Sequence, residues 1–276
     1  MLSVHALLRL LSLSAFTLST LTGIANAAII GIANGDALVG DRGSNLLANG
    51  SFETGHPSPG LDVGWTPGTI HVGGYPATEV GSIPGWTATY TDGAYGAWGP
   101  FGAAGAGPAH GANQLYFGNW FTNITEAPIA GPTGEITFAG TPVFTNDAGL
   151  GPLTLSQTVS GLTIGQTYLL DFFVTGEENT TSFTNLGLFG LTVGSELRYL
   201  QIPTSTNAFG ASQRYQVTFA ADTTSVDIAF SNWGHLPFQG AELVLDDVIL
   251  NVVPEPGTAL LLGLGLAGLS RRSLER

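Results

Sequence analysis

The sequence contains no cysteine and no lysine. Without cysteine the folded body cannot be held by disulfides, although an oxidising compartment would permit them, so a hydrophobic core or a bound metal must stabilise it. A chain of this length buries enough apolar surface to be stable without covalent cross-links. The absence of cysteine also excludes a thiol nucleophile.

Positive charge is nearly absent from the middle of the chain. Between the two ends only Arg42, Arg198 and Arg214 oppose eighteen acidic residues, and the whole chain has a net charge of -13. A surface this negative repels nucleic acid and anionic lipid headgroups, so both are excluded as partners of the body. Cations and neutral polymers remain.

Motifs of hydrolytic catalysis are missing as well. The histidines are isolated from one another, and neither H-E-x-x-H nor G-x-S-x-G occurs. Two acidic pairs, Glu177-Glu178 and Asp246-Asp247, are neighbours in sequence, and such neighbours seldom converge as a catalytic acid and base. We therefore expect a protein without enzymatic activity.

The N-terminus has the three parts of a signal peptide in the right order. Arg9 supplies a weakly basic head, residues 10–21 are apolar except for Ser and Thr, and Ala25-Asn26-Ala27 has the small-x-small pattern that signal peptidase accepts. We expect residues 1–27 to be removed on export, leaving a lead-in over residues 28–44.

The C-terminus carries a second address. Pro254-Glu255-Pro256 cannot lie inside a helix or a sheet, so it separates the folded body from the C-terminal segment. Residues 258–270 are uncharged and apolar on every side, which suits a helix in lipid. These thirteen residues span roughly 20 Å, less than the roughly 30 Å hydrocarbon core. The arginines after them favour a cytoplasmic end and an outward-facing body.

This arrangement over residues 252–276 resembles the PEP-CTERM family of sorting signals. The residues that carry the likeness are Val253, Pro254, Glu255, Pro256, Arg271 and Arg272. The resemblance implies processing by an exosortase, a membrane transpeptidase-like enzyme of Gram-negative bacteria that make exopolysaccharide. It implies an exported protein of the cell envelope, cell surface or extracellular matrix, anchored transiently or permanently in the inner membrane. A plain C-terminal membrane anchor is the alternative.

Between the two ends the chain is rich in turns. Forty glycines and fifteen prolines, with few charges, indicate short strands joined by tight connections. Apolar and polar residues alternate over residues 153–159, 214–219 and 226–230, the pattern of half-buried strands, and residues 168–174 are apolar on nearly both faces. Further strand candidates are residues 46–48, 86–91, 113–118, 134–138, 187–193 and 242–250. We predict an all-β fold, a jelly-roll-like β-sandwich over residues 45–251.

Four stretches of this body resemble landmarks of galactose-binding-like jelly rolls, a group that includes several carbohydrate-binding modules. They are residues 45–53, 83–86, 155–168 and 245–248, in the order of that group. The resemblance implies a structural Ca²⁺ shared by a glutamate of the first strand and an aspartate of the last.

On this resemblance the calcium ligands are Glu53 and Asp246, with Asn49 and Ser51 able to add oxygens. Calcium prefers hard oxygen ligands, and a body poor in basic residues leaves its carboxylates without cations. Neighbouring strand residues point to opposite faces, so only one of Asp246 and Asp247 can face the site, and the motif position favours Asp246. The alternative is that these acids are solvated strand ends.

Aromatic side chains concentrate in the glycine-rich region over residues 90–121. Rings exposed on loops can stack on the apolar faces of sugars. Trp86 follows a turn and opens a strand, so we expect it in the core. The candidates for ligand contact are Trp98, Trp120, Trp233 and Tyr95. These features favour a non-catalytic module that binds extracellular polysaccharide, and a structural matrix protein without a specific ligand is the alternative.

Overall fold

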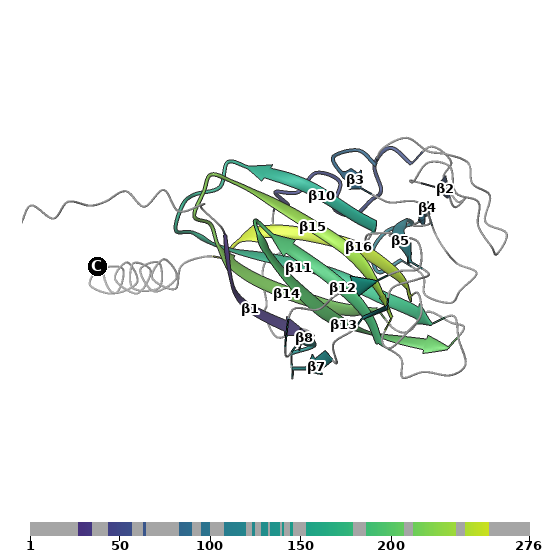
Figure 1. Cartoon of the computed structure of the whole chain (residues 1–276). Helices are drawn as coiled ribbons and strands as arrows, with labels where there is room; N and C mark the ends of the chain where they lie inside the picture. The colour runs from purple at the N-terminus through teal and green to yellow at the C-terminus, as the bar shows by residue number, and fades with distance from the viewer. Residues whose placement is uncertain are drawn as a thin grey trace, which may run out of the picture.

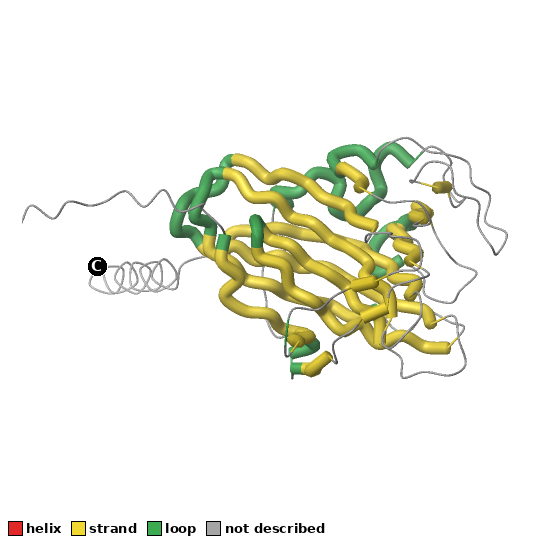
Figure 2. The backbone as a smooth tube through the Cα atoms, viewed as in Figure 1, coloured by secondary structure: helices red, strands yellow, loops and turns green. Residues whose placement is uncertain are grey.

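A computed structural model of the chain describes the folded body and leaves both ends undescribed. The described residues are 27–34, 44–56, 63–64, 83–89, 95–99, 108–119, 123–124, 128–131, 133–138, 140, 144–145, 153–178, 186–206, 212–235 and 241–253. Within them the chain forms strands and turns and no helix, in two sheets that face each other as a sandwich (Figures 1 and 2). The expected all-β sandwich is therefore confirmed.

We call the two sheets A and B. Sheet A contains, in spatial order, β2 (Val63–Gly64), β4 (Tyr95–Gly99), β5 (Gln114–Asn119), β16 (Ala241–Val252), β11 (Thr167–Glu178), β14 (Gln213–Ala220) and β1 (Ala28–Asn34). Sheet B contains β3 (Thr87–Thr89), β10 (Leu153–Ser160), β15 (Ser225–His235), β12 (Leu186–Val193), β13 (Glu196–Thr206), β8 (Glu135–Phe138) and β7 (Pro128–Ala130). A separate pair joins β6 (Asn123–Ile124) to β9 (Phe144–Thr145).

Within each sheet the neighbouring strands run antiparallel. The two sheets are joined where the ends of β11 and β13 pair in parallel, residues 176–178 against 204–206. The described loops lie at the ends of the long strands (Figure 2).

The core lies between the sheets, because alternate residues of each strand point inward. In β10 the inward residues are buried and the outward ones are half-buried or exposed. Phe172 of β11 meets Phe189 and Phe230 from sheet B, with ring centroids 6.2 and 5.1 Å apart, and stacks on Tyr215 of β14 at 5.9 Å. Offset and edge-to-face aromatic contacts of this kind stabilise the core beyond the area that they bury.

The expected lead-in over residues 28–44 begins with a strand. Residues 28–34 form β1, which pairs with β14 from Ala28 opposite Ala220 to Asn34 opposite Tyr215. The sandwich therefore begins directly after the expected cleavage point. Strand β13, which the sequence pattern did not indicate, completes the centre of sheet B.

The strand expected at residues 46–48 is absent, because these residues form bends and turns. The side chain of Asn45 forms hydrogen bonds with the backbone of β16. Its amide nitrogen donates to the carbonyl of Val248 at 2.7 Å, and its oxygen accepts the N–H of Leu250 at 2.8 Å. This segment therefore lies beside β16 without joining sheet A.

The last described residue is hydrogen-bonded to the start of β11 and to the turn before it. Val253, the last described residue, donates its N–H to the carbonyl of Thr167 at 2.9 Å and accepts a hydrogen bond from Gln166 at 2.8 Å. The sorting residues Pro254, Glu255, Pro256, Arg271 and Arg272, the apolar segment 258–270 and signal residues 1–26 lie outside the described residues. In the described part, no helix has the length and apolar character needed to cross a membrane.

Candidate functional site

An apolar cluster lies on the outer face of sheet B, outside the core. Ile136 of β8 and Leu188 of β12 are buried at its base, and the half-buried rings of Phe138, Tyr199 and Trp233 pack against them. The rings meet edge to face, with centroids 5.4 Å apart between Phe138 and Tyr199 and 5.7 Å apart between Tyr199 and Trp233. We call these three residues the aromatic cluster.

A glycine positions the indole of Trp233. A Cβ atom at Gly190 would lie 2.4 Å from Nε1 of Trp233 and 2.3 Å from Oγ of Ser231, distances that real Cβ atoms do not show. The indole therefore lies directly over the backbone of β12, in space that any other residue would fill. Nε1 donates a hydrogen bond to Oγ of Ser231 at 2.8 Å. The polar edge of the indole is thereby satisfied within the sheet, as a partly buried indole requires.

The strand register extends this face across the sheet. Tyr199 is opposite Gly190, Gly190 opposite Ser231, Ser231 opposite Thr154, and Thr154 opposite Thr89. Four interstrand steps of about 4.8 Å make this row about 19 Å long. It passes from aromatic rings over small residues to hydroxyl groups. Burial raises the pKa of Tyr199, so its phenol remains a hydrogen-bond donor at neutral pH.

Trp98 corrects the sequence-based expectation of an exposed tryptophan. Its side chain is fully buried at 0% exposure, and its indole N–H donates to the carbonyl of Phe52 at 2.7 Å. The ring of His56 contacts it edge-on, with centroids 4.6 Å apart. The expectation was wrong because the register of β4 against β5 turns this residue toward the core, although glycines flank it. Trp86 is buried as expected.

Of the other expected ligand contacts, Trp233 belongs to the aromatic cluster on sheet B. Tyr95 opens β4, and its side chain lies outside the described residues, as does Trp120. The sequence pattern did not single out Tyr199 or Phe138. No signal in residues 196–202 marks Tyr199 as outward-facing, because both faces of this strand mix apolar and polar residues.

The expected calcium ligands Glu53 and Asp246 enclose one segment, residues 109–113. Oε1 of Glu53 accepts the N–H groups of Ala112 and Asn113, both at 2.8 Å, and Oδ2 of Asp246 accepts the N–H of His110 at 2.8 Å. A Cβ at Gly111 would lie 2.4 Å from Oε1 of Glu53, so glycine is required for this close wrap. The structure therefore brings the two carboxylates to the same segment.

Asn49 braces the loop that carries Glu53. Its side-chain oxygen accepts the N–H of Thr54 at 2.9 Å, and its amide donates to the carbonyls of Thr54 and Pro84. Ser51 is half-buried in the same turn. Among the described residues, no three His, Cys, Asp or Glu side chains gather as a metal site. Carboxylate oxygens are ligands that calcium prefers, although the oxygens of Glu53 and Asp246 already accept N–H groups. Further ligands of the ion would come from the Ser51 hydroxyl, backbone carbonyls or water.

A bulge in β16 changes the expected orientation of Asp246 and Asp247. The pairing of β11 with β16 shifts register between Asp171 and Phe173, and Asp247 has a φ of 50°. Both aspartates are buried, so the alternation of a regular strand does not apply to them. Gly50 allows this bulge, because a Cβ there would lie 2.0 Å from the carbonyl oxygen of Val248.

The bulge leaves a carboxyl group with little solvent. Burial raises the pKa of Asp246 to about 7, and the negative charge of Asp247 also raises it. Hydrogen bonds from the backbone N–H groups of His110 and Asp247 lower it, but by less. A carboxyl group in this setting is partly protonated at neutral pH, and a bound cation would favour its ionised form.

A buried ion pair lies on the outer side of sheet A. Nε of Arg214 donates to the carboxylate of Asp171 at 2.8 and 3.0 Å, Nη2 contacts it as well, and Gln216 donates to it at 3.2 Å. Asp171 is 4% exposed, so the guanidinium replaces its solvation. We assign this pair to the stability of sheet A.

Comparisons with known proteins identify the C-terminal segment. Residues 252–276 match the PEP-CTERM protein-sorting motif, which confirms the expected tail and indicates an exported, cell-envelope-associated protein that an exosortase processes. Among curated protein sequences none matches the chain.

Solved structures that align with most of this chain include two proteins described in connection with sugars. One is TmCBM61 in complex with β-1,4-galactotriose, with 17% identity, 76% of this chain and 99% of that chain covered, and a TM-score of 0.41. Another is a Bacteroides thetaiotaomicron VPI-5482 protein assigned as sugar-binding, with 12% identity, 76% and 100% covered, and a TM-score of 0.37. The enzymatically active domain of tailspike protein 4 of bacteriophage CBA120 shows 12% identity, 77% and 22% covered, and a TM-score of 0.40.

Proposed function

We propose that this exported protein is a non-catalytic module that binds a neutral extracellular polysaccharide on the outer face of sheet B. The observation that carries the proposal is the aromatic cluster, with the indole of Trp233 fixed over Gly190. A rigid ring beside hydroxyl groups suits a sugar, because its apolar face stacks on the ring while its hydroxyls form hydrogen bonds.

The row from Tyr199 to Thr89 supports a chain ligand rather than a single sugar. Its length of about 19 Å spans several linked sugar rings. Gly190 and Ser231, at its centre, are buried, with the indole of Trp233 over Gly190. The parts nearer the surface are the half-buried Tyr199 and Trp233 at one end and Thr154 and Thr89 at the other. The net charge of -13 favours a neutral polymer over an acidic one, since like charges repel.

The test is binding of the full exported chain to a panel of neutral and acidic polysaccharides, including the host's own, by affinity electrophoresis and calorimetry. We expect Trp233→Ala to weaken binding about tenfold or more, because stacking on an indole contributes at least the roughly 1.4 kcal/mol that a tenfold change represents. Ile30→Ala is the matched control, since Ile30 is an exposed apolar residue of sheet A. Wild-type protein that binds no glycan at millimolar concentration refutes the proposal.

One further outcome identifies the alternative of a matrix protein without a ligand. The cluster also packs β8 onto sheet B, so Trp233→Ala lowers the melting temperature in either case. If the variant melts earlier and binds the glycan as the wild type does, the cluster is structural.

We propose also that Glu53 and Asp246 hold a structural Ca²⁺. The support is that both carboxylates wrap residues 109–113 and that Asp246 is buried beside a second carboxylate. When bound, the ion would neutralise these charges and fix the segment to β16. Calcium should raise the melting temperature above that in chelator, because an ion that binds only the folded protein stabilises it. Equal melting temperatures in calcium and in chelator would refute this proposal.

We propose, finally, that the host is a Gram-negative bacterium and that the apolar segment 258–270 holds the chain in its inner membrane until the exosortase acts. The PEP-CTERM match supports the route. Intact mass measurement of the protein from its host should show loss of the residues after Pro256. A chain that retains Arg276 in every molecule would favour a permanent anchor.

A further inference from the structure

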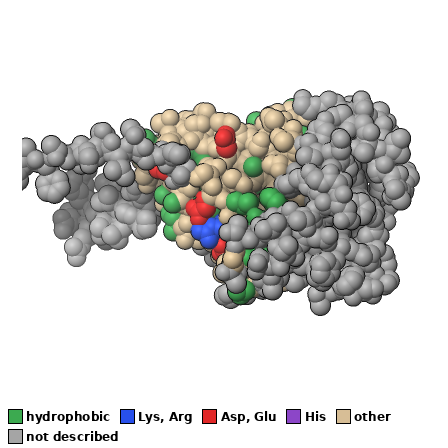
Figure 3. Space-filling view, in the orientation of Figure 1, with side chains coloured by type: hydrophobic (Ala, Val, Ile, Leu, Met, Phe, Trp, Pro, Cys, Tyr) green, Lys and Arg blue, Asp and Glu red, His purple; other side chains and the backbone are tan. Residues whose placement is uncertain are grey.

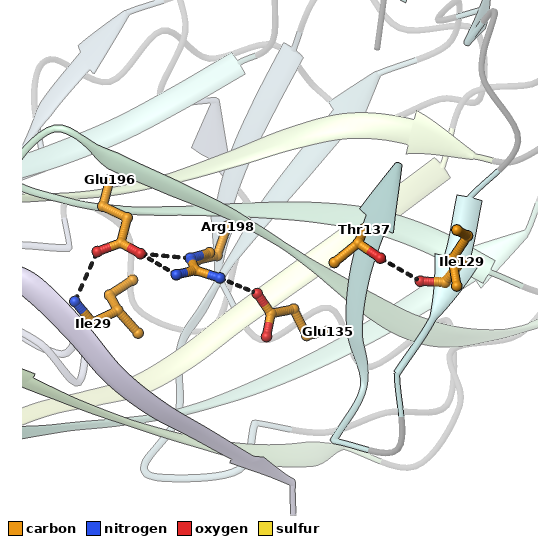
Figure 4. Close-up of polar contacts among 6 residues, drawn as sticks. All are labelled: Ile29, Ile129, Glu135, Thr137, Glu196 and Arg198. Atoms are coloured by element: carbon orange, nitrogen blue, oxygen red, sulfur yellow. Dashed lines mark hydrogen bonds and ion pairs between the residues drawn. The ribbon is translucent and has the colours of Figure 1, made fainter. Parts of the chain in front are cut away.

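Strand β1 lies at the edge of sheet A and contacts sheet B through a side chain. The N–H of Ile29 donates to Oε2 of Glu196, the first residue of β13, at 2.8 Å. Figure 4 shows this bond bridging the two strands. An N–H at the edge of a sheet would otherwise be open to pairing with another chain. Glu196 therefore caps the edge strand and links the first described strand to the opposite sheet.

Glu196 belongs to a cluster with one more acid than base. Arg198 donates from Nε to Oε1 of Glu196 at 2.7 Å and from Nη1 to Oε1 of Glu135 at 2.7 Å (Figure 4). Burial alone would raise the pKa of Glu196, but the Ile29 N–H and Arg198 outweigh it and hold the pKa below its usual value. In Figure 3 the blue basic atoms on the described part of the face lie against red acidic ones. Two carboxylates and one guanidinium leave a net charge of one negative unit.

The expected processing creates a positive charge beside this cluster. Cleavage after Ala27 turns the nitrogen of Ala28 into an α-ammonium group. Three backbone bonds totalling about 4.3 Å separate the nitrogens of Ala28 and Ile29. Since the nitrogen of Ile29 is 2.8 Å from Oε2 of Glu196, the ammonium lies within about 7 Å of that oxygen.

The path of the chain supports this placement. Ala27 is buried against the turn between β12 and β13, where its nitrogen would lie 3.2 Å from a Cβ at Gly194. That turn leads directly into Glu196. The chain therefore reaches β1 alongside the cluster.

We propose that the α-ammonium group formed at Ala28 by signal cleavage is the missing cation of the Glu196–Arg198–Glu135 cluster and that it latches β1 to sheet B. The processed body is then more stable than the same body with a blocked N-terminus. The role is separate from glycan binding, because it involves the junction of β1 with sheet B rather than the aromatic cluster.

The absence of lysine makes this directly testable, since the α-amine is the only primary amine of a chain that begins at Ala28. Chain 28–276, purified in mild detergent, is compared with the same protein after amine-directed acetylation. At low ionic strength and neutral pH we expect the free amine to raise the melting temperature by about 2 °C, the effect of one exposed ion pair in a body of this size.

Variants of the two carboxylates test whether the α-ammonium group stabilises the protein through Glu196. Glu196→Gln should abolish the difference between the free and acetylated forms. Glu135→Gln keeps Glu196 but removes the excess negative charge of the cluster, so it should reduce the difference without abolishing it. Equal melting temperatures of the free and acetylated wild type, or a difference that survives in Glu196→Gln, would overturn the proposal. So would an exported protein whose intact mass shows a first residue other than Ala28.

Discussion

Asp246 gives the sharpest test of the candidate calcium site, because its protonation couples to folding. Burial raises its pKa in the folded protein to about 7 from 3.8, and the charge of Asp247 adds to the rise. In the absence of metal, the folded protein keeps this proton at pH values where the unfolded chain has released it. Substitution with asparagine removes the titration and keeps the side-chain size.

The sign and size of the expected change in stability with pH come from the linkage between proton binding and folding. Between about pH 4 and 7 the folded state binds the proton more tightly, so its contribution to stability is fully present at low pH and is lost as pH rises through about 7. A rise of about three pKa units corresponds to about 4 kcal/mol over the whole window. Asp246 is 2% exposed, so solvent screening reduces this figure little.

The assay is urea unfolding of wild type and Asp246→Asn in chelator, from about pH 4.5 to 8. The difference between the two proteins cancels other titrating groups, and we expect it to change by about 3 kcal/mol across this range in favour of the variant. The amide cannot accept both backbone N–H groups, which costs the variant about 1–2 kcal/mol at every pH. The slope is therefore the readout.

If calcium binds here, it makes the wild type more stable than Asp246→Asn at the pH where the variant is the more stable in chelator. A concentration a hundred times Kd adds about 2.7 kcal/mol to the wild type, and it adds nothing to a variant that lacks the ligand. Parallel pH profiles of wild type and Asp246→Asn in chelator would refute the burial argument. Identical wild-type stability in calcium and in chelator would refute the metal site alone.

Three substitutions test which side chains belong to the core, to the outer face of sheet B and to the buried ion pair of sheet A. Gly190→Ala should displace the indole of Trp233 and weaken glycan binding as Trp233→Ala does, at a cost of about 1–3 kcal/mol from overpacking, measured by calorimetry and urea unfolding. Trp98→Ala should destabilise the fold by about 3–5 kcal/mol and leave glycan affinity unchanged while the protein stays folded; a loss of affinity without loss of stability would contradict its placement in the core. Arg214→Gln should cost about 3–5 kcal/mol in urea unfolding, and adding Asp171→Asn should recover most of it, because the cost is that of an unpaired buried charge.

Local patterns in the sequence predicted the strands that alternate clearly. Strand β10 has the buried and open alternation that its sequence indicates, and β14 and β15 lie at the expected positions. Strand β1 was missed because Ala28–Asn34 has no polar alternation, and its pairing depends on β14 from the far end of the chain. The turn at residues 46–48 was misread because the hydrogen bonds of the Asn45 side chain cannot be seen in a hydrophobic pattern.

The carboxylates of the candidate metal site show the same division. Motif likeness selected Glu53 and Asp246, and the structure brings both to residues 109–113. The motif likeness could not show the bulge that buries Asp247 as well. That bulge depends on contact between Gly50 and Val248, which are distant in sequence. Positive φ at a non-glycine residue is sustained only by such surrounding contacts.

Trp98 and Trp233 explain why aromatic residues on glycine-rich segments cannot be assigned to a surface from local sequence. Both have glycine neighbours, yet Trp98 is buried and Trp233 is half-buried on an outer face. Which face a strand residue occupies depends on register, and a shift of one residue would exchange the two. For Trp233 the deciding partner is Gly190 on another strand, since the indole can lie against sheet B only where no side chain fills that space. A tryptophan whose ring lies over a glycine of the neighbouring strand is therefore the feature that distinguishes this candidate sugar-stacking ring from a core residue, and it becomes visible only when the pairing of β12 with β15 is known.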